Sequence, residues 1–176
     1  MDDTRNVIDK FKGRDIEDIV TSLDENGVRL EVAIENLERD FNMGTIVRSA
    51  NAFGVRHVHI IGRRQWNKRG AMMTDKYLHV HYHTDTDAFL DFVSDSEAEL
   101  IAIDNVAGSQ PLTQTPLPIK VILLFGAERS GIRPELLQAA THIAAIEQFG
   151  STRSLNVGVA AGIVMYEWLR RNTLAA

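Results

Sequence analysis

From residue 28 onward, short stretches patterned like buried strands alternate with stretches of helical spacing, and this alternation constrains the fold most. The expected strands cover residues 29–34, 55–61, 100–103, 120–125 and 142–146, and the expected helices cover residues 44–53, 86–93, 134–140 and 154–171. The strand 120–125 reads KVILLF, a nearly continuous apolar run that is typical of a strand buried on both faces of a parallel sheet. The sequence therefore predicts an α/β fold with a mostly parallel sheet and helices on both faces.

The first 27 residues follow a different pattern. They are rich in charge, their apolar residues recur at helical spacing, and Asn26-Gly27 is a plausible helix stop. We expect a helical extension over residues 1–27 that packs on a larger unit over residues 28–176. A chain of 176 residues fits a single domain overall.

Composition excludes several classes of function. The chain has no cysteine, which excludes disulfides, a thiolate nucleophile and a thiolate metal site. It begins without a signal-peptide pattern, and its apolar runs are too short to span a bilayer, so we expect a soluble, cytoplasmic protein without a membrane partner. The net charge of −5 argues against a protein that coats nucleic acid, so any RNA contact requires a local basic patch.

Three segments that follow predicted strands carry candidate chemistry, because ligands of open α/β sheets bind at the carboxyl ends of the strands. The first runs from Asn42 to Arg48. Arg48 follows Gly44 by four residues, so both lie on one face of the expected helix. Taken alone, the segment is better explained by an N-capping Asn followed by a surface Arg.

The second segment, residues 125–132, has Gly126 and Gly131 on either side of Glu128. Such glycines suggest a tight loop whose backbone approaches another group closely, although a plain turn with a solvated Glu is the simpler alternative. The segment lacks the Gly-Lys-Ser/Thr ending of a phosphate loop, and the chain has no GxGxxG.

The third segment, residues 146–157, ends in Ser154-Leu155-Asn156-Val157 and continues into small residues. Ser154 could N-cap the last helix. The small residues that follow would let another backbone segment lie close against that helix.

In this order the three segments resemble the motifs of the SpoU (TrmH-like) branch of the SPOUT RNA methyltransferases, from about Val28 to Leu169. The resemblance implies an S-adenosylmethionine-dependent enzyme that methylates a ribose 2′-hydroxyl of tRNA or rRNA. It also implies a deep C-terminal trefoil knot, an exception to the rule against knotted chains. Members of the family are homodimers whose site is completed across the interface, and residues 28–176 would be the catalytic domain.

The resemblance also assigns roles to single residues. Gly126, Ile146 and Leu155 would bind S-adenosylmethionine, with Ser154 nearby. Arg48 would lie beside the 2′-hydroxyl; because a guanidinium holds its proton, we expect it mainly to grip the adjacent phosphate and orient the hydroxyl. The residues expected to support it in catalysis are Asn42, Glu128, Ser154 and Asn156.

A basic patch follows the strand 55–61. It consists of Arg63, Arg64, Lys68 and Arg69 with Trp66 among them, a combination that single-stranded RNA recognition uses, although a solvated loop is the alternative. Arg129 and Arg153 would add to the same RNA-binding face. His79, His81 and His83 alternate, but they have no obvious carboxylate partner and the reaction needs no metal, so we expect none.

The chain departs from the common family pattern at Ala127, at Glu147-Gln148 and at Arg153. These departures leave open an RNA-binding relative with weak or no catalysis. A knotted methyltransferase acting on a base nitrogen is a second alternative, which Ser-Leu-Asn-Val argues against. Between tRNA and rRNA, we favour tRNA slightly, because so little of the chain lies outside the catalytic unit.

Overall fold

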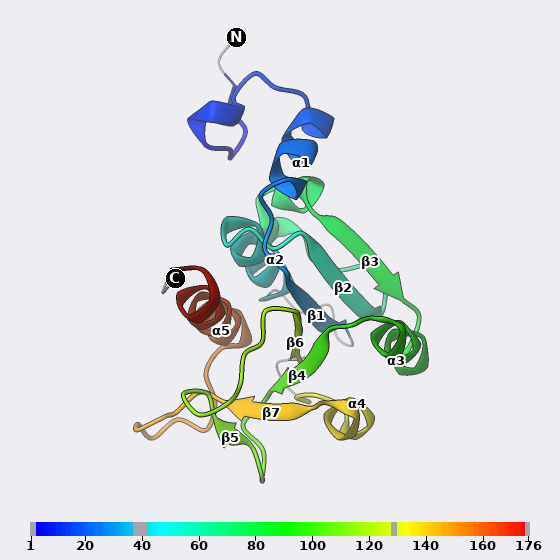
Figure 1. Cartoon of the computed structure of the whole chain (residues 1–176), viewed down its shortest axis with the longest axis vertical. Coiled ribbons are helices and arrows are strands. Elements are labelled where there is room, and N and C mark those ends of the chain that lie inside the picture. The colour runs from blue at the N-terminus through cyan, green and yellow to red at the C-terminus, as the bar shows by residue number, and fades with distance from the viewer. Residues whose placement is uncertain (1–2, 37–41, 128–129, 175–176) are drawn as a thin grey trace.

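Within residues 3–36, 42–127 and 130–174, which a computed structural model describes, seven strands form one sheet (Figure 1). Their order is β3-β2-β1-β6-β4-β7-β5, and all neighbours run parallel. The strands are β1 (Leu30–Asn36), β2 (His57–Gly62), β3 (His79–His83), β4 (Glu99–Ile103), β5 (Gln110–Pro111), β6 (Val121–Phe125) and β7 (His142–Ala145). The predicted α/β fold with a parallel sheet is confirmed.

Helices cover both faces of this sheet. The helices are α1 (Ile16–Asp24), α2 (Asn42–Ala52), α3 (Thr86–Asp95), α4 (Pro134–Ala139) and α5 (Val157–Leu169), with a π-helical turn at Arg170–Leu174. Apolar residues of α2 and α5 pack with alternate strand residues in one core, and those of α3 and α4 pack with the others in a second core. The strand β6 lies between β1 and β4 with all five residues buried, as its apolar run predicts.

The N-terminal segment forms a small cluster of its own. A 3-10 turn at Asp9–Phe11 and the helix α1 bury Phe11 and Ile19 against Tyr77, which belongs to a second 3-10 turn at Thr74–Tyr77. Asp24, at the end of α1, ties this segment to the sheet, because its carboxylate accepts hydrogen bonds from Arg56 Nε at 2.7 Å and His79 Nε2 at 3.0 Å. The division of the chain at residue 27 stays a prediction.

Several boundaries differ from the predicted ones. The helix α2 includes Asn42 rather than beginning near Gly44, and α5 begins at Val157 rather than at Ser154. The strands β3 and β5 were not among the five expected from the apolar pattern, because β3 carries three histidines and β5 has two residues. In the described residues, no helix is long and apolar enough to cross a membrane. The trefoil knot implied by the resemblance stays a prediction.

Candidate active site

A cavity of about 290 Å³ opens at the carboxyl ends of β4, β6 and β7, where the chain runs into α5. This volume is close to the lower end of the usual range for small-molecule sites. The predicted cofactor residues Gly126, Ile146, Ser154 and Leu155 all line it, and Asn156 lines it as well. The fold thus brings together parts of the second and third motifs.

The loop after β6 is tight, and its glycines explain why. A Cβ atom on Gly126 would lie 2.3 Å from the carbonyl carbon of Gly131, so only a glycine allows this approach. The Gly131 N–H donates to the Ala127 carbonyl at 2.9 Å, and Gly131 has a φ of +67°. The far side of the loop is held by Asp104, whose carboxylate accepts a hydrogen bond from Ile132 N–H at 3.0 Å. Glu128 and Arg129 lie outside the described residues.

The start of α5 is capped by Asn156. Its Oδ1 atom accepts hydrogen bonds from the N–H groups of Gly158 at 2.9 Å and Val159 at 3.2 Å. The alternative that Ser154 caps this helix is therefore wrong: Ser154 precedes the cap by two residues and lines the cavity instead.

The first motif meets the third through this cap. With Oδ1 committed to the helix, the Nδ2 atom of Asn156 donates to Asn42 Oδ1 at 2.9 Å. The two helices also touch here, because a Cβ atom on Gly158 would lie 3.1 Å from Thr45 Cγ2. The N-terminal turn of α2 is therefore fixed beside the cavity.

Arg48 lies six residues after Asn42 on α2 and is exposed. Among the described residues it has no hydrogen-bond or ion-pair partner, and it does not line the cavity itself. A free, exposed guanidinium at this position is available to an external phosphate. The geometry thus separates a cavity for a small molecule from a cation on the neighbouring helix.

Comparison with known proteins identifies the family. Residues 29–166 match the SpoU rRNA Methylase family. This chain belongs to that family. A tRNA (guanosine(18)-2′-O)-methyltransferase of Thermus thermophilus is 26% identical over 154 residues, which cover 83% of this chain and 77% of the relative.

Solved structures of the family share the fold. An rRNA methyltransferase from Sinorhizobium meliloti with bound AdoMet superimposes with a TM-score of 0.73 and 26% identity; the match covers 81% of this chain but 56% of that one. A TrmH/SpoU tRNA modifying enzyme of A. aeolicus has a TM-score of 0.77 at 23% identity, with 91% of this chain and 85% of that one covered. The latter likeness concerns the fold alone.

The cavity fits the cofactor that SpoU methylases use. Its walls combine apolar side chains (Phe125, Ile146 and Leu155) with exposed backbone of the two loops and the carboxylate of Asp104. Apolar walls suit an adenine ring, and a carboxylate suits a cationic group. Gly126 and Gly131 both line the cavity and have no side chain, so the loop presents only backbone to the cavity at these two positions.

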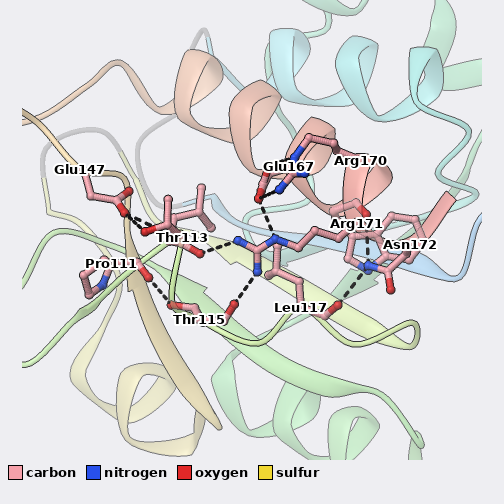
Figure 2. A network of polar contacts seen from close by, with 11 residues as sticks. Pro111, Thr113, Thr115, Leu117, Glu147, Glu167, Arg170, Arg171 and Asn172 are labelled. Atoms are coloured by element: carbon pink, nitrogen blue, oxygen red, sulfur yellow. Dashed lines mark hydrogen bonds and ion pairs between the residues drawn. The ribbon is translucent and has the colours of Figure 1, made fainter. Parts of the chain in front are cut away.

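The departure from the common SpoU pattern at Glu147 has a structural role. Glu147 accepts hydrogen bonds from the Thr113 hydroxyl and, at 3.2 Å, from the Thr113 N–H (Figure 2). These hydrogen bonds, the one from the Thr113 side chain first, lower the pKa of Glu147. The cavity loop is therefore anchored to the segment after β5.

The segment after β5 is also bonded to the π-helical turn at Arg170–Leu174. Arg171 donates to the carbonyls of Thr115 at 2.7 Å and Leu112 at 2.8 Å, and its Nε pairs with Glu167 at 2.6 Å (Figure 2). Glu167 also pairs with Arg170, and the hydrogen bonds from Arg170 and Arg171 lower the pKa of Glu167 to about 2. The turn at Arg170–Leu174 thus fixes the segment to which Glu147 is bonded.

The basic patch lies in the loop after β2. Arg63, Arg64, Lys68 and Arg69 are exposed, and Lys68 pairs with Asp75 at 2.7 Å. Trp66 is only 8% exposed and belongs to the core, and Lys68 Nζ lies over its ring at 5.4 Å from the centroid, so the ring presents too little surface for a base to stack on. This corrects the expected stacking role of Trp66: its large apolar surface is buried beneath the loop.

An aromatic ring that was not predicted lies beside this patch. Tyr82 on β3 is 38% exposed, and the guanidinium of Arg64 lies 4.9 Å from its ring centroid. The signal was present in the sequence HVHYH, because the alternation along a strand places Tyr82 on the face opposite the histidines. Arg153, by contrast, lies in the loop beside the cavity, where its carbonyl accepts a hydrogen bond from Asn105 Nδ2 at 3.2 Å.

The histidines form a row across β2 and β3. His59 contacts His83 at 3.0 Å and the carboxylate of Glu31 at 2.7 Å, and His57 contacts His81 at 3.0 Å. Burial and the neighbouring histidines lower the pKa of His81 to about 4, and burial also lowers the pKa values of His57 and His83. Within the described residues, no group of three or more His, Asp or Glu side chains is arranged to hold a metal ion.

Proposed function

We propose that this chain transfers a methyl group from S-adenosylmethionine to a ribose 2′-hydroxyl of RNA. The observation that carries the proposal is the Asn42–Asn156 hydrogen bond, which fixes the helix of Arg48 beside the cavity of the second and third motifs. S-adenosylmethionine, when bound, supplies the methyl group on a sulfonium. The protein supplies alignment, which accounts for much of catalysis when a cofactor carries the reactive group.

The residues divide the work between the cavity and the helix α2. Gly126, Ile146 and Leu155 hold the cofactor, with Ser154 beside it. Arg48 binds the phosphate next to the target ribose and orients the 2′-hydroxyl of that ribose. Any transfer of the hydroxyl proton to Arg48 depends on the contact between the guanidinium and the phosphate. Asn42 and Asn156 position α2, and Glu128 is assigned to this support by resemblance.

The substrate is RNA, and we infer tRNA. The Thermus thermophilus relative is named for methylation of a tRNA guanosine. The exposed cations Arg63, Arg64, Lys68 and Arg69 supply the phosphate contacts that an acidic protein needs, with Arg129 and Arg153 as further contacts. A tRNA substrate also favours the cytoplasm as the place of action.

A second copy of the chain completes the enzyme. Val159, Ile163 and Tyr166 on α5 are 53%, 40% and 52% exposed, and their spacing places them on one face of the helix. They line an open groove that reaches Ile146 and Glu147 at the cavity. Because apolar patches of this kind mark interfaces, and most oligomers are symmetric dimers, we infer a homodimer through α5.

Methyl transfer by the purified chain tests the proposal. The chain is incubated with S-adenosylmethionine labelled on the methyl group and with total tRNA or, in a parallel reaction, rRNA, and the RNA is digested to nucleosides. Label in 2′-O-methylated nucleosides supports the proposal. Cofactor binding without transfer to tRNA or rRNA would instead favour an RNA-binding relative, and label on a base nitrogen would favour the other branch of knotted methyltransferases.

Arg48→Lys tests the role of the guanidinium. Near-normal turnover with retained RNA binding rules out a specific role for this group, because a lysine offers a point charge without the planar fork. A loss of about tenfold or more in turnover, with RNA affinity kept, supports it.

A further inference from the structure

Tyr82 and Arg64 present an open aromatic and cationic surface at the edge of the sheet. Tyr82 is the fourth residue of β3, the end strand of the sheet, and it points away from the face that carries His81 and His83. The Arg64 guanidinium lies over its ring at 4.9 Å, and both residues are exposed. Stacked pairs of this kind bind the faces of unpaired bases in single-stranded RNA.

The loop that carries Arg64 is fixed rather than left to solvent. Asn36, the last residue of β1, is fully buried, and its Nδ2 atom donates to the carbonyls of Arg63 at 2.5 Å and Gln65 at 3.0 Å. The Arg63 N–H donates back to the Asn36 carbonyl at 3.2 Å. The backbone on both sides of Arg64 is therefore held in place, and a preorganised surface loses less entropy when it binds a ligand.

The pair borders an open hollow of about 680 Å³. Its lining residues are Arg64, Gln65, Trp66, Asn67, Lys68 and Tyr82. No carboxylate is among these residues, but Lys68 pairs with Asp75 at 2.7 Å, so the positive charge of the hollow rests mainly on Arg64. Asn67 offers its Nδ2 group as a donor to the edge of a base, because its Oδ1 atom already accepts a hydrogen bond from the Arg69 N–H at 3.0 Å.

The hollow and the cofactor cavity both lie at the carboxyl ends of the parallel strands. Because the strands are parallel, the carboxyl ends of β2 and β3 point the same way as those of β4, β6 and β7. Tyr82 is on β3, which is three positions from β6 and four from β4 in the sheet, and this corresponds to roughly 14–19 Å at the usual strand spacing. A nucleotide near the methylated one in the chain of an RNA can span this separation.

We propose that Tyr82 and Arg64 bind a base of the RNA substrate that flanks the methylated nucleotide. The base stacks on the Tyr82–Arg64 surface, and Arg63, Lys68 and Arg69 contact the adjoining phosphates. This inference rests on the proposed function and adds to it a site for a second, unmethylated nucleotide. It also assigns to Tyr82 the stacking role that the buried Trp66 is unable to fill.

Two RNA probes of equal charge separate base contacts from phosphate contacts. One is a 12-nucleotide oligoadenylate, and the other is a 12-nucleotide abasic oligoribonucleotide, both measured by fluorescence anisotropy with the full chain. Tyr82→Leu removes the ring but keeps apolar cover on the strand, and we expect it to weaken oligoadenylate binding about tenfold while abasic binding stays the same. Tyr82→Phe keeps the ring and should bind both probes like the unaltered chain.

Arg64→Gln removes a charge and the upper layer of the stack. It should lower the affinity for both probes, and the affinity for oligoadenylate more than that for the abasic probe. Arg14→Gln is a matched loss of charge in the N-terminal segment, and it should leave the ratio of the two affinities unchanged. The inference is overturned if Tyr82→Leu binds oligoadenylate normally, or if it weakens both probes equally.

A separate measurement distinguishes this failure from a failure of the proposed function. If the unaltered chain methylates tRNA but Tyr82→Leu binds each probe with the affinity of the unaltered chain, only the nucleotide site is wrong. If the unaltered chain transfers no methyl group to any RNA and binds neither probe, both proposals are wrong. Methyl transfer with a KM for tRNA that rises in Tyr82→Leu and stays normal in Tyr82→Phe supports both.

Discussion

Asn156 donates a side-chain hydrogen bond to Asn42 at 2.9 Å and thereby joins two segments that are 114 residues apart in the chain. The same Asn156 caps α5 with its other amide atom. One side chain therefore sets both the start of the last helix, which borders the cofactor cavity, and the position of the helix that carries Arg48. We expect activity to depend on both functions of this amide.

Substitutions at Asn156 separate these two functions. Serine is as good an N-cap as asparagine, but its hydroxyl is too short to reach Asn42 as the amide does, whereas alanine loses both functions. We expect Asn156→Ala to cost about 1 kcal/mol of unfolding free energy, and Asn156→Ser less than about half of that. Methyl transfer should fall at least tenfold in both variants, and full activity in Asn156→Ser would contradict the positioning role.

Gly126→Ala tests the close approach in the loop after β6. The added Cβ atom would lie 2.3 Å from the Gly131 backbone, so the loop must move. We expect a loss of about 1–3 kcal/mol in unfolding free energy, as for other overpacked sites, and at least tenfold weaker binding of S-adenosylmethionine by calorimetry. Gly150→Ala is the matched control, because a Cβ atom there meets nothing within 4 Å. If the two variants bind the cofactor equally well, the loop backbone does not form the pocket.

The C-terminal network predicts unequal roles for two adjacent arginines. Arg171 is largely buried and holds two backbone carbonyls of the segment that anchors Glu147, whereas the more exposed Arg170 pairs only with Glu167 among the described residues. We expect Arg171→Ala to cost about 2 kcal/mol or more, because it removes the hydrogen bonds that Arg171 donates to two backbone carbonyls and to Glu167. Arg170→Ala should cost less than about 1 kcal/mol, as exposed ion pairs do. Urea unfolding measures both, and equal losses would contradict this account.

The row of histidines predicts that stability depends on pH. The pKa of His81 is lowered from 6.5 to about 4, so the unfolded chain binds more protons than the folded one between these values. The unfolding free energy should therefore be full above about pH 6.5 and fall as pH drops toward 4, with His57 and His83 contributing in the same direction. Burial raises the pKa of Glu31, but its hydrogen bond with His59 and the charge of His59 lower it overall, so Glu31 reduces the unfolding free energy only below about pH 4.5.

His81→Gln tests this origin of the pH dependence. Urea unfolding at pH 7 and pH 5 should show a smaller difference in the variant than in the unaltered chain. His142→Gln, on β7 and outside the row, should keep the original difference. A pH dependence that is the same in all three proteins would place its origin elsewhere.

The strong patterns of the sequence predicted the fold and the weak ones did not. The run KVILLF predicts a buried strand without further information, because a central strand of a parallel sheet is apolar on both faces. In HVHYH the apolar signal is nearly absent, since the histidines of β3 are satisfied by His57, His59 and Asp24, which no local pattern reveals.

The candidate site shows the same limit. Gly126, Ile146 and Leu155 were predicted through resemblance and do line one cavity. Ser154 and Asn156 are both good capping residues, and the choice between them depends on Asn42, which is distant in sequence. Trp66 stands among cations in the sequence, yet its burial depends on the core beneath the loop. Tertiary contacts decided each of these cases.

The most direct test of the central claim is a map of 2′-O-methyl positions in the tRNA and rRNA of cells with and without the gene. The account predicts that methylation is lost at a specific ribose, that the unaltered gene restores it, and that Arg48→Ala does not restore it although the protein accumulates normally. An unchanged map, or full restoration by Arg48→Ala, would contradict it.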